Sequence, residues 1–269
     1  YIFSAPTSKE LNLLDFINVE EYIKRNDFDI VIHTAKFGGT RKVPNTAEVA
    51  ELNFRMFYNI IRNGKYFSKM IFLGSGADYD VSRPLVKVKE EEFDKVVPKD
   101  SFGFYKYICS KYIEKTDKII NLRLFGIYGK YEDYELRFIS NAICKNIFNL
   151  PITMRQNVFF DYVYINDFIK ILDYFLRNNS KEKFYNIGTG KSIDLLTIAK
   201  TVNRISENKS KIIIKKKGLN NEYTCDNRRL LKEIPNLRFT DFKNSVEELY
   251  SWYKSIKPSL KREWFFVDK

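Results

Sequence analysis

Residues 69–75, with the sequence KMIFLGS, form a short apolar run that ends at a glycine and a serine. Comparable apolar runs lie upstream at residues 29–33 (DIVIH) and downstream at residues 119–124 (IINLRL). The intervening residues 47–62 and 102–118 have the length and the apolar spacing of helices. Because buried strands separated by such helices require crossover connections, the sequence predicts an α/β fold with a parallel sheet.

The pattern changes after Gly129. Helices are predicted at residues 135–146, 193–205 and 245–253, and shorter strands near residues 158–162, 183–186 and 211–214. At the other end of the chain, residues 1–4 are predicted to be the end of a strand, and residues 19–25 a helix capped by Asn18. We therefore expect a first domain at residues 1–130, rejoined by about residues 156–190, and a smaller lobe over most of residues 131–269.

Composition excludes several classes of protein. The 269 residues are 44% hydrophobic and 30% charged, which is typical of a globular chain. No stretch reaches the roughly 18 apolar residues of a membrane span, so no membrane partner is expected. The net charge of +12 brings nucleic acid into consideration, but a solvated, lysine-rich surface is favoured, with a phosphate-bearing small substrate as one contributor. Three scattered cysteines and one histidine predict a cytoplasmic protein without a zinc site.

Tyr107 and Lys111 are the strongest candidates for chemistry. Residues four apart on a helix share one face, with about 5–6 Å between their Cβ atoms. An ammonium group there favours the phenolate, so we expect the pKa of Tyr107 to be lowered. Such a tyrosine can exchange a proton with a sugar hydroxyl or ketone, which is worth about 10²–10⁴ in rate. Between them, Cys109 and Ser110 are interpreted as residues that only fill the helix.

Ser75 lies just beyond the carboxyl end of a predicted strand, where open α/β sheets bind ligands. Its hydroxyl could hold a carbonyl oxygen against the proton of Tyr107. His33 ends another strand at the same edge, and a buried structural role is favoured for it.

Six segments in order resemble the extended short-chain dehydrogenase/reductase family, the nucleotide-sugar epimerases and reductases. The resemblance covers nearly the whole chain, and it implies a doubly wound Rossmann-type sheet with a C-terminal substrate-binding lobe. Two further segments, ELNLLD at residues 10–15 and AKFGG at residues 35–39, look most like the GDP-fucose synthase branch. The six segments are VIHTA (31–35), GSGADY (74–79), YICSK (107–111), LRLFGIYG (122–129), FFDYVYINDF (159–168) and FYNIGTGKSI (184–193).

The resemblance implies a role for each matching position. In the catalytic set, Tyr107 is the acid and base, Lys111 its electrostatic partner and ribose ligand, and Ser75 the group that binds the reacting oxygen. Cofactor contacts are implied for Tyr107 and Lys111 as well. They are also implied for Asn12 and Leu13 beside the adenine, Ala35 and Lys36 along the cofactor path, and Phe125 near the nicotinamide. Asn157 and Arg228 are candidates for holding the nucleoside diphosphate of the sugar.

Departures from the family pattern narrow the reaction. Dehydratases of this family carry Asp-Glu where this chain has Gly76 and Ala77, which disfavours dehydration. The 3,5-epimerisation of GDP-fucose synthase uses a cysteine where Ala77 stands and a later histidine, but this chain has no histidine beyond His33. Reduction of a 4-keto sugar, or 4-epimerisation through a transient ketone, is therefore the expected activity.

The family's glycine-rich loop would precede Tyr1, so we expect the natural protein to carry a first strand and this loop upstream. The cofactor is NADP or NAD. Ser4, Thr7, Ser8 and Lys9 offer no acid for a ribose diol and favour NADP. The family also implies a homodimer through the helices that carry Asn53 and Tyr107. The alternative to an enzyme is a non-catalytic Rossmann-like binding or scaffold protein, for which the positive charge suggests polyanions.

Overall fold

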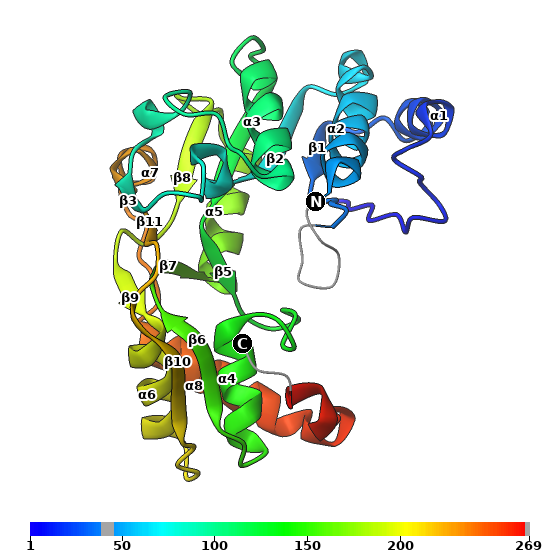
Figure 1. The fold of residues 1–269 in the computed structure, drawn as a ribbon. Coiled ribbons are helices and arrows are strands. Elements are labelled where there is room, and N and C mark those ends of the chain that lie inside the picture. Colours follow the sequence, from blue (N-terminus) through cyan, green and yellow to red (C-terminus); the bar gives the residue numbers. More distant parts are fainter. Residues whose placement is uncertain (39–45, 267–269) are drawn as a thin grey trace. The chain divides into compact units, whose positions relative to one another are not determined.

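The computed structural model describes residues 1–38 and 46–266, and Gly39 of the glycine pair lies outside them. The chain forms two compact units, which are taken in turn (Figure 1). The first unit comprises Tyr1–Asp80, Glu92–Arg123 and Asn179–Tyr185, and the second comprises Val81–Glu91, Leu124–Asn178 and Asn186–Lys269.

A four-stranded sheet with the strand order β1-β2-β4-β8 forms the centre of the first unit, to which the first two residues of β8 belong. β1 and β2 are parallel, with His33 opposite Phe72. The parallel pairing and the helices between the strands confirm the predicted α/β, Rossmann-type class. The strands are β1 (Ile30–His33), β2 (Lys69–Ser75), β4 (Ile119–Leu124) and β8 (Phe184–Ile187).

In the described part of this unit the α-helices are α1 (Phe16–Asn26), α2 (Ala47–Ile61) and α3 (Ser101–Ile113). α2 packs against both α1 and α3 (Figure 1). Apolar side chains from these helices, from β2 and β4, and from the segment just before β2 make the core: Val19, Ile23, Phe57, Ile60, Phe67, Met70, Phe72, Tyr105, Cys109, Ile113 and Ile119.

Three boundaries differ from the prediction. Asp15, not Asn18, caps α1, because the Asp15 carboxylate accepts from the Asn18 amide while the Asn18 side chain accepts from Asn12. α3 ends at Ile113 instead of continuing to residue 118, because Lys115 and Thr116 turn the chain towards β4. Residues 1–4 form no strand, since no described strand pairs with them.

The second unit contains two sheets. β10 pairs with β6 in parallel, and a five-stranded sheet has the order β3-β11-β7-β5, with β9 antiparallel to β7. These strands are β3 (Leu85–Val88), β5 (Gly126–Tyr128), β6 (Ile152–Asn157), β7 (Phe159–Tyr164), β9 (Ser192–Asp194), β10 (Ile212–Leu219) and β11 (Tyr223–Cys225).

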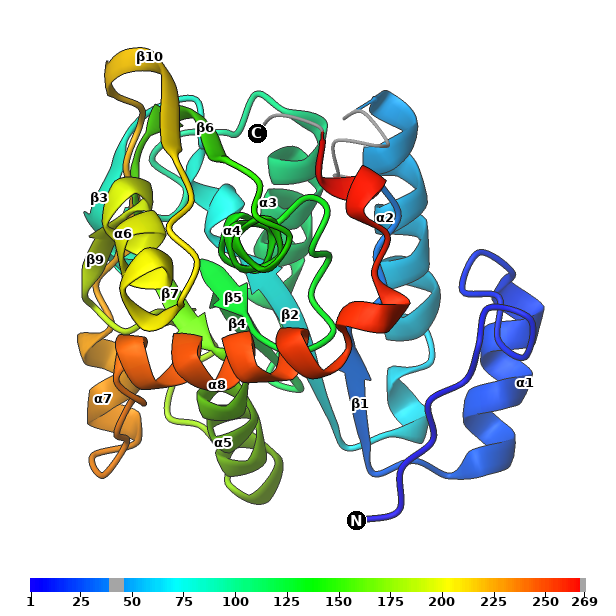
Figure 2. The same ribbon diagram turned by 90° about the horizontal axis from the view of Figure 1, so that it is seen from below.

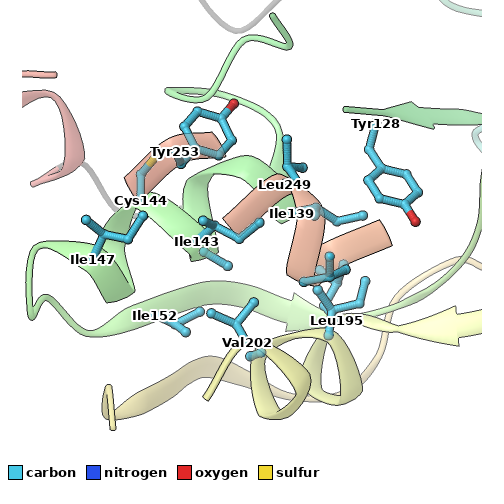
Figure 3. Close-up of a cluster of buried hydrophobic side chains, with 14 of the residues drawn as sticks. Tyr128, Ile139, Ile143, Cys144, Ile147, Ile152, Leu195, Val202, Leu249 and Tyr253 are labelled. Atoms are coloured by element: carbon cyan, nitrogen blue, oxygen red, sulfur yellow. The ribbon is translucent and has the colours of Figure 1, made fainter. Parts of the chain in front are cut away.

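Helix α4 is the core of the second unit, and every residue from Ile139 to Ile147 is buried. α6 and α8 pack against it (Figure 2). Ile143 on α4 lies among Val202 of α6 and Leu249 of α8, in a contiguous apolar cluster (Figure 3). The helices of this unit are α4 (Phe138–Ile147), α5 (Ile165–Arg177), α6 (Leu195–Ile205), α7 (Arg228–Glu233) and α8 (Phe242–Ser255).

Sequence reasoning missed α5, although its signal is present. Phe168, Ile171 and Phe175 are buried at spacings of three and four residues, which is the pattern of an amphipathic helix. β10 is also longer than predicted, because its pairing with β6 continues to Lys216 opposite Gln156 and Leu219 opposite Asn157.

Candidate functional site

Ser75 ends β2 and begins a short 3₁₀ helix, η2 (Gly76–Tyr79). Its Oγ accepts a hydrogen bond from the Ala77 amide at 3.1 Å, which caps η2 and fixes the serine side chain. The side chain is half-buried. The hydroxyl predicted to bind a reacting oxygen is therefore held at the carboxyl end of a central strand.

Helix α3 packs along this strand end. A Cβ on Gly103 would lie 2.9 Å from the Ala77 carbonyl oxygen, so only glycine allows so close an approach. One turn further, Lys106 Nζ donates to the Leu73 carbonyl oxygen at 2.6 Å. A further turn on, Ser110 Oγ donates to Asp78 Oδ2 at 2.5 Å. Tyr107 thus sits on a helix anchored on both sides of it to residues 73–78.

Asp78 is the centre of a buried polar network. Arg123 Nε lies 2.9 Å from Asp78 Oδ2, and both side chains are at most 1% exposed. Asn121 Nδ2 donates to Ser110 Oγ at 2.7 Å, so the Ser110 hydroxyl links Asn121 to Asp78. The interpretation of Ser110 as helix filler was therefore wrong, because its hydroxyl ties α3 to η2 and β4.

Tyr107 and Lys111 meet at a carboxylate that sequence reasoning missed. The Tyr107 hydroxyl donates to Asp94 Oδ1, and Lys111 Nζ lies 2.8 Å from Asp94 Oδ2. Lys111 Nζ also lies 2.8 Å from Glu114 Oε2. Asp94 comes from the loop before α3 and adopts a left-handed backbone conformation with φ of 69°. Nothing in the spacing of the motif indicates this contact.

The expected lowering of the Tyr107 pKa was wrong. The hydrogen bond to Asp94 raises the pKa of Tyr107, burial adds to the rise, and the Lys111 charge offsets only part of it. Lys111 and Tyr107 in turn lower the pKa of Asp94, while Asp94 and Glu114 raise the pKa of Lys111. Tyr107 is therefore a neutral phenol near neutral pH.

A buried ammonium and the only histidine lie beside this strand end. Lys106 is 6% exposed, and burial lowers its pKa to about 8. His33 packs against Phe57 and Phe72, and burial together with the Lys106 charge lowers its pKa to about 3. This environment agrees with the structural role expected for His33.

Four of the residues predicted to bind the cofactor lie in two parts of the first unit. Asn12 and Leu13 precede α1, where Asn12 Oδ1 accepts from Leu14 and the Leu13 carbonyl accepts from Asn59. Ala35 and Lys36 follow β1. Lys36 Nζ lies 5.4 Å from the centre of the Phe102 ring at the start of α3.

Asn53 fixes the segment that follows β1. Its buried amide accepts from the Phe37 amide at 2.9 Å and donates to the Phe37 carbonyl at 2.7 Å. Through Asn53, helix α2 therefore fixes the backbone beside Ala35 and Lys36. Asn53 lies outside the VIHTA and AKFGG segments, so these segments alone do not indicate the contact.

The remaining candidates belong to the second unit. The buried Phe125 ring contacts Tyr223, with 4.8 Å between ring centres. Asn157 donates to Asp194 and accepts from Val158 and Leu196, so its amide also supports the start of α6.

Asn157 lines a cavity of about 370 Å³ with Ile214, Lys216, Lys217, Gly218 and Leu219. Arg228 is 74% exposed and is paired with Asp226 at 2.6 Å, which raises the pKa of the guanidinium.

None of the helices within residues 1–38 and 46–266 is long and apolar enough to cross a membrane. Over the same described ranges, His, Cys, Asp and Glu side chains form no cluster that could hold a metal ion. The first unit is thus an α/β, Rossmann-type fold in which Tyr107 and Lys111 lie on helix α3 and Ser75 ends a central strand.

The NAD dependent epimerase/dehydratase family model matches residues 4–188, and the chain belongs to this family. This match confirms the resemblance to extended short-chain dehydrogenases/reductases.

Two relatives are enzymes that act on nucleotide sugars by name. The chain is 28% identical over 222 residues to dTDP-4-dehydro-6-deoxyglucose reductase of Escherichia coli, which covers 75% of this chain and 64% of that protein. It is 26% identical over 136 residues to ADP-L-glycero-D-manno-heptose-6-epimerase of Brachyspira hyodysenteriae, which covers 45% and 42%. The matches thus span less than two thirds of these relatives.

The fold is similar to the solved structure of a GDP-L-fucose synthetase from Naegleria fowleri bound to NADP. The TM-score is 0.81 at 13% identity, over 96% of this chain and 86% of that one. At this identity the likeness concerns the fold alone.

Proposed function

We propose that this protein is an NAD(P)-dependent enzyme that reduces or epimerises C4 of a sugar linked to a nucleoside diphosphate. The observation that carries the proposal is the meeting of Tyr107 and Lys111 on one face of α3, a helix packed along the segment that begins at Ser75. Membership of the NAD dependent epimerase/dehydratase family supports it.

Each of the three residues has a defined task in this proposal. The bound cofactor supplies or accepts the hydride at C4. Tyr107 gives its phenolic proton to the C4 oxygen when a ketone is reduced, and takes a proton back when an alcohol is oxidised. Ser75 donates a hydrogen bond to that oxygen. Lys111 binds the ribose hydroxyls and stabilises negative charge on Tyr107.

Cofactor binding is assigned to Asn12, Leu13, Ala35, Lys36 and Phe125. The Lys36 ammonium fits a phosphate-bearing cofactor by charge, and Asn53 holds the adjacent backbone in place. The exposed side chains of Ser8 and Lys9 favour NADP over NAD, because they could bind the additional phosphate of NADP. Thr7 is left out of this set, because its hydroxyl donates to Glu10. This preference predicts weaker binding of NADPH when Lys9 is replaced by Glu.

The nucleoside diphosphate of the substrate is assigned to Asn157 and Arg228. In support, the cavity beside Asn157 is also lined by Lys216 and Lys217, whose ammonium groups suit a phosphate. Arg228 can bind an anion in two hydrogen bonds only by leaving part of its contact with Asp226.

A homodimer is proposed through α2 and α3. Phe54 and Tyr58 on α2 are stacked 6.0 Å apart and exposed. Phe104 and Tyr112 on α3 are exposed as well. Sedimentation equilibrium should show a dimer, and replacement of Tyr58 by Glu should shift it towards monomer.

The decisive experiment is a panel of nucleoside-diphosphate 4-keto sugars incubated with NADPH or NADH and read by mass spectrometry. We expect one member to gain two mass units, and the Tyr107→Phe variant to leave it unchanged. A panel in which no sugar is converted, by an enzyme that binds the cofactor, would contradict the proposal.

The competing function is polyanion binding without catalysis. It is favoured by one observation: Lys215, Lys216 and Lys217 are consecutive and exposed on β10. It predicts RNA affinity that falls steeply with salt, without nicotinamide fluorescence on addition of NADPH.

A further inference from the structure

The two carboxylate oxygens of Asp94 contact the proposed proton donor, Tyr107, and its electrostatic partner, Lys111. Oδ1 accepts from the Tyr107 hydroxyl, and Oδ2 lies 2.8 Å from Lys111 Nζ. The separation of 13 residues between Asp94 and Tyr107 means that the loop before α3 delivers the carboxylate from outside the motif.

The neighbouring aromatic residue fixes this loop. The Phe93 ring lies 5.4 Å from the Tyr107 ring and 6.0 Å from the Phe184 ring, measured between centres. The buried Arg123 guanidinium lies 4.3 Å from the centre of the Phe93 ring. Phe93 is thus held against α3 and β4, so the carboxylate of the next residue has a defined position.

We propose that Asp94 is a positioning residue of the Tyr107–Lys111 pair, which holds the Tyr107 hydroxyl in the protonated, proton-donating form up to higher pH. The role of that proton in ketone reduction rests on the proposed function, whereas the contact between Asp94 and Tyr107 does not.

The proton inventory supports this role. A carboxylate and a phenolate repel each other, so the contact between Asp94 and Tyr107 exists only while one proton is shared between them. Of the charged groups that act on Tyr107, Asp94 and Glu114 favour the phenol and only Lys111 favours the phenolate. The reductive step consumes the phenolic proton: hydride adds to the ketone carbon, the cofactor is oxidised, and the phenol protonates the oxygen.

Oxidation of the alcohol needs Tyr107 in the deprotonated state, because the phenolate is the base that accepts the proton. The negative charge of Asp94 opposes this ionisation, so the phenolate forms only at higher pH. With Asp94 in place, reduction therefore persists to higher pH and oxidation begins at higher pH than with a neutral residue.

The test measures ionisation of Tyr107 in the full chain by tyrosinate difference absorbance against Tyr107→Phe in each background. Asp94→Asn keeps the shape and an acceptor but removes the charge, and we expect it to increase the ionisation constant of Tyr107 by about tenfold. Asp94→Glu keeps the charge and should restore most of the wild-type behaviour. Glu114→Gln is the matched control, because Glu114 contacts Lys111 at the same 2.8 Å but not Tyr107, and its effect should be smaller.

Two results would overturn the proposal. One is an ionisation midpoint that Asp94→Asn leaves unchanged or moves upward. The other, which needs no variant at position 94 to fold, is a wild-type midpoint below the usual tyrosine value of about 10.

Where turnover is found, the alkaline limb of the pH profile for reduction should move down in Asp94→Asn by the same amount. If Asp94→Asn shifts the ionisation of Tyr107 but no turnover is found, the positioning role is supported and the proposed reaction is rejected. If turnover is found but Asp94→Asn does not shift the ionisation, the proposed reaction is supported and the positioning role is rejected.

Discussion

Two of the carboxylates that contact helix α3, those of Asp78 and Asp94, differ chiefly in burial. Asp78 binds a hydroxyl on α3, that of Ser110, and a cation, Arg123. Asp94 likewise binds a hydroxyl, that of Tyr107, and a cation, Lys111. The first ion pair is at most 1% exposed, whereas the side chains of the second are 44% and 36% exposed.

The difference in burial gives the two carboxylate sites different roles, one in stability and one in reactivity. A buried ion pair is costly to break, because removing one partner leaves an uncompensated charge without water. An exposed pair contributes little to folding, and its partners can exchange with a ligand. The inner site, formed by Asp78, Ser110 and Arg123, therefore fixes the position of α3. The outer site, formed by Asp94, Tyr107 and Lys111, presents groups that can react.

The largest expected effect is on the outer site. Tyr107→Phe should lower turnover by about 10²–10⁴ while cofactor affinity stays nearly unchanged, because only the proton donor is lost. Steady-state kinetics and cofactor fluorescence measure the two quantities. Tyr105→Phe, on the same helix, is the control, because the buried Tyr105 hydroxyl makes no hydrogen bond with the described residues. Loss of cofactor affinity with turnover intact would contradict the assigned role.

At the inner site the effect should appear in stability. Asp78→Ala leaves the Arg123 charge buried and unpaired, so we expect the free energy of unfolding in urea to fall by about 3–5 kcal/mol. Asp173→Ala, which breaks the exposed pair with Arg177, should cost less than about 1 kcal/mol. Equal losses in the two variants would end the distinction between buried and exposed pairs.

His33 extends the comparison to pH. Its pKa of about 3 lies below the unfolded value, so below about pH 6.5 the unfolded chain binds a proton that the folded chain does not. Stability therefore falls as pH falls. Between pH 7 and pH 5 this histidine should account for a loss of about 2 kcal/mol. Because the chain has one histidine, His33→Gln should remove this part of the slope, and identical slopes would refute the burial argument.

The smallest effect is expected from Asp94→Asn on folding, because asparagine also tolerates the left-handed backbone of this residue. Since its pair with Lys111 is exposed, the urea midpoint should not change measurably. A large destabilisation would mean that Asp94 belongs with Asp78 as a structural residue.

The sequence predicts the strands of the first unit well, because apolar runs such as residues 69–75 and 119–124 are signals carried by consecutive residues. It also predicts that Tyr107 and Lys111 share a helix face, which follows from helical geometry alone. It does not predict Asp94. That contact depends on a left-handed residue in an irregular loop, and no periodic pattern encodes such a conformation.

The wrong direction for the Tyr107 pKa has the same origin. Spacing along one helix identifies only Lys111 as a neighbour, whereas the dominant charge arrives from another segment. For Ser110, the sequence analysis underestimated the role of a residue inside the motif. Its hydroxyl looks incidental within the motif, yet Asp78 and Asn121 converge on it from η2 and β4.

The most direct test of the central claim is transfer of a label from the cofactor to the sugar. NADPH or NADH deuterated at the nicotinamide C4 is incubated with the full-length protein and the panel of 4-keto sugars, and the products are examined by NMR. We predict deuterium bonded to the sugar C4, and none with Tyr107→Phe. Label at another carbon, or equal transfer by the variant, would contradict the claim that Ser75, Tyr107 and Lys111 act together on a C4 ketone.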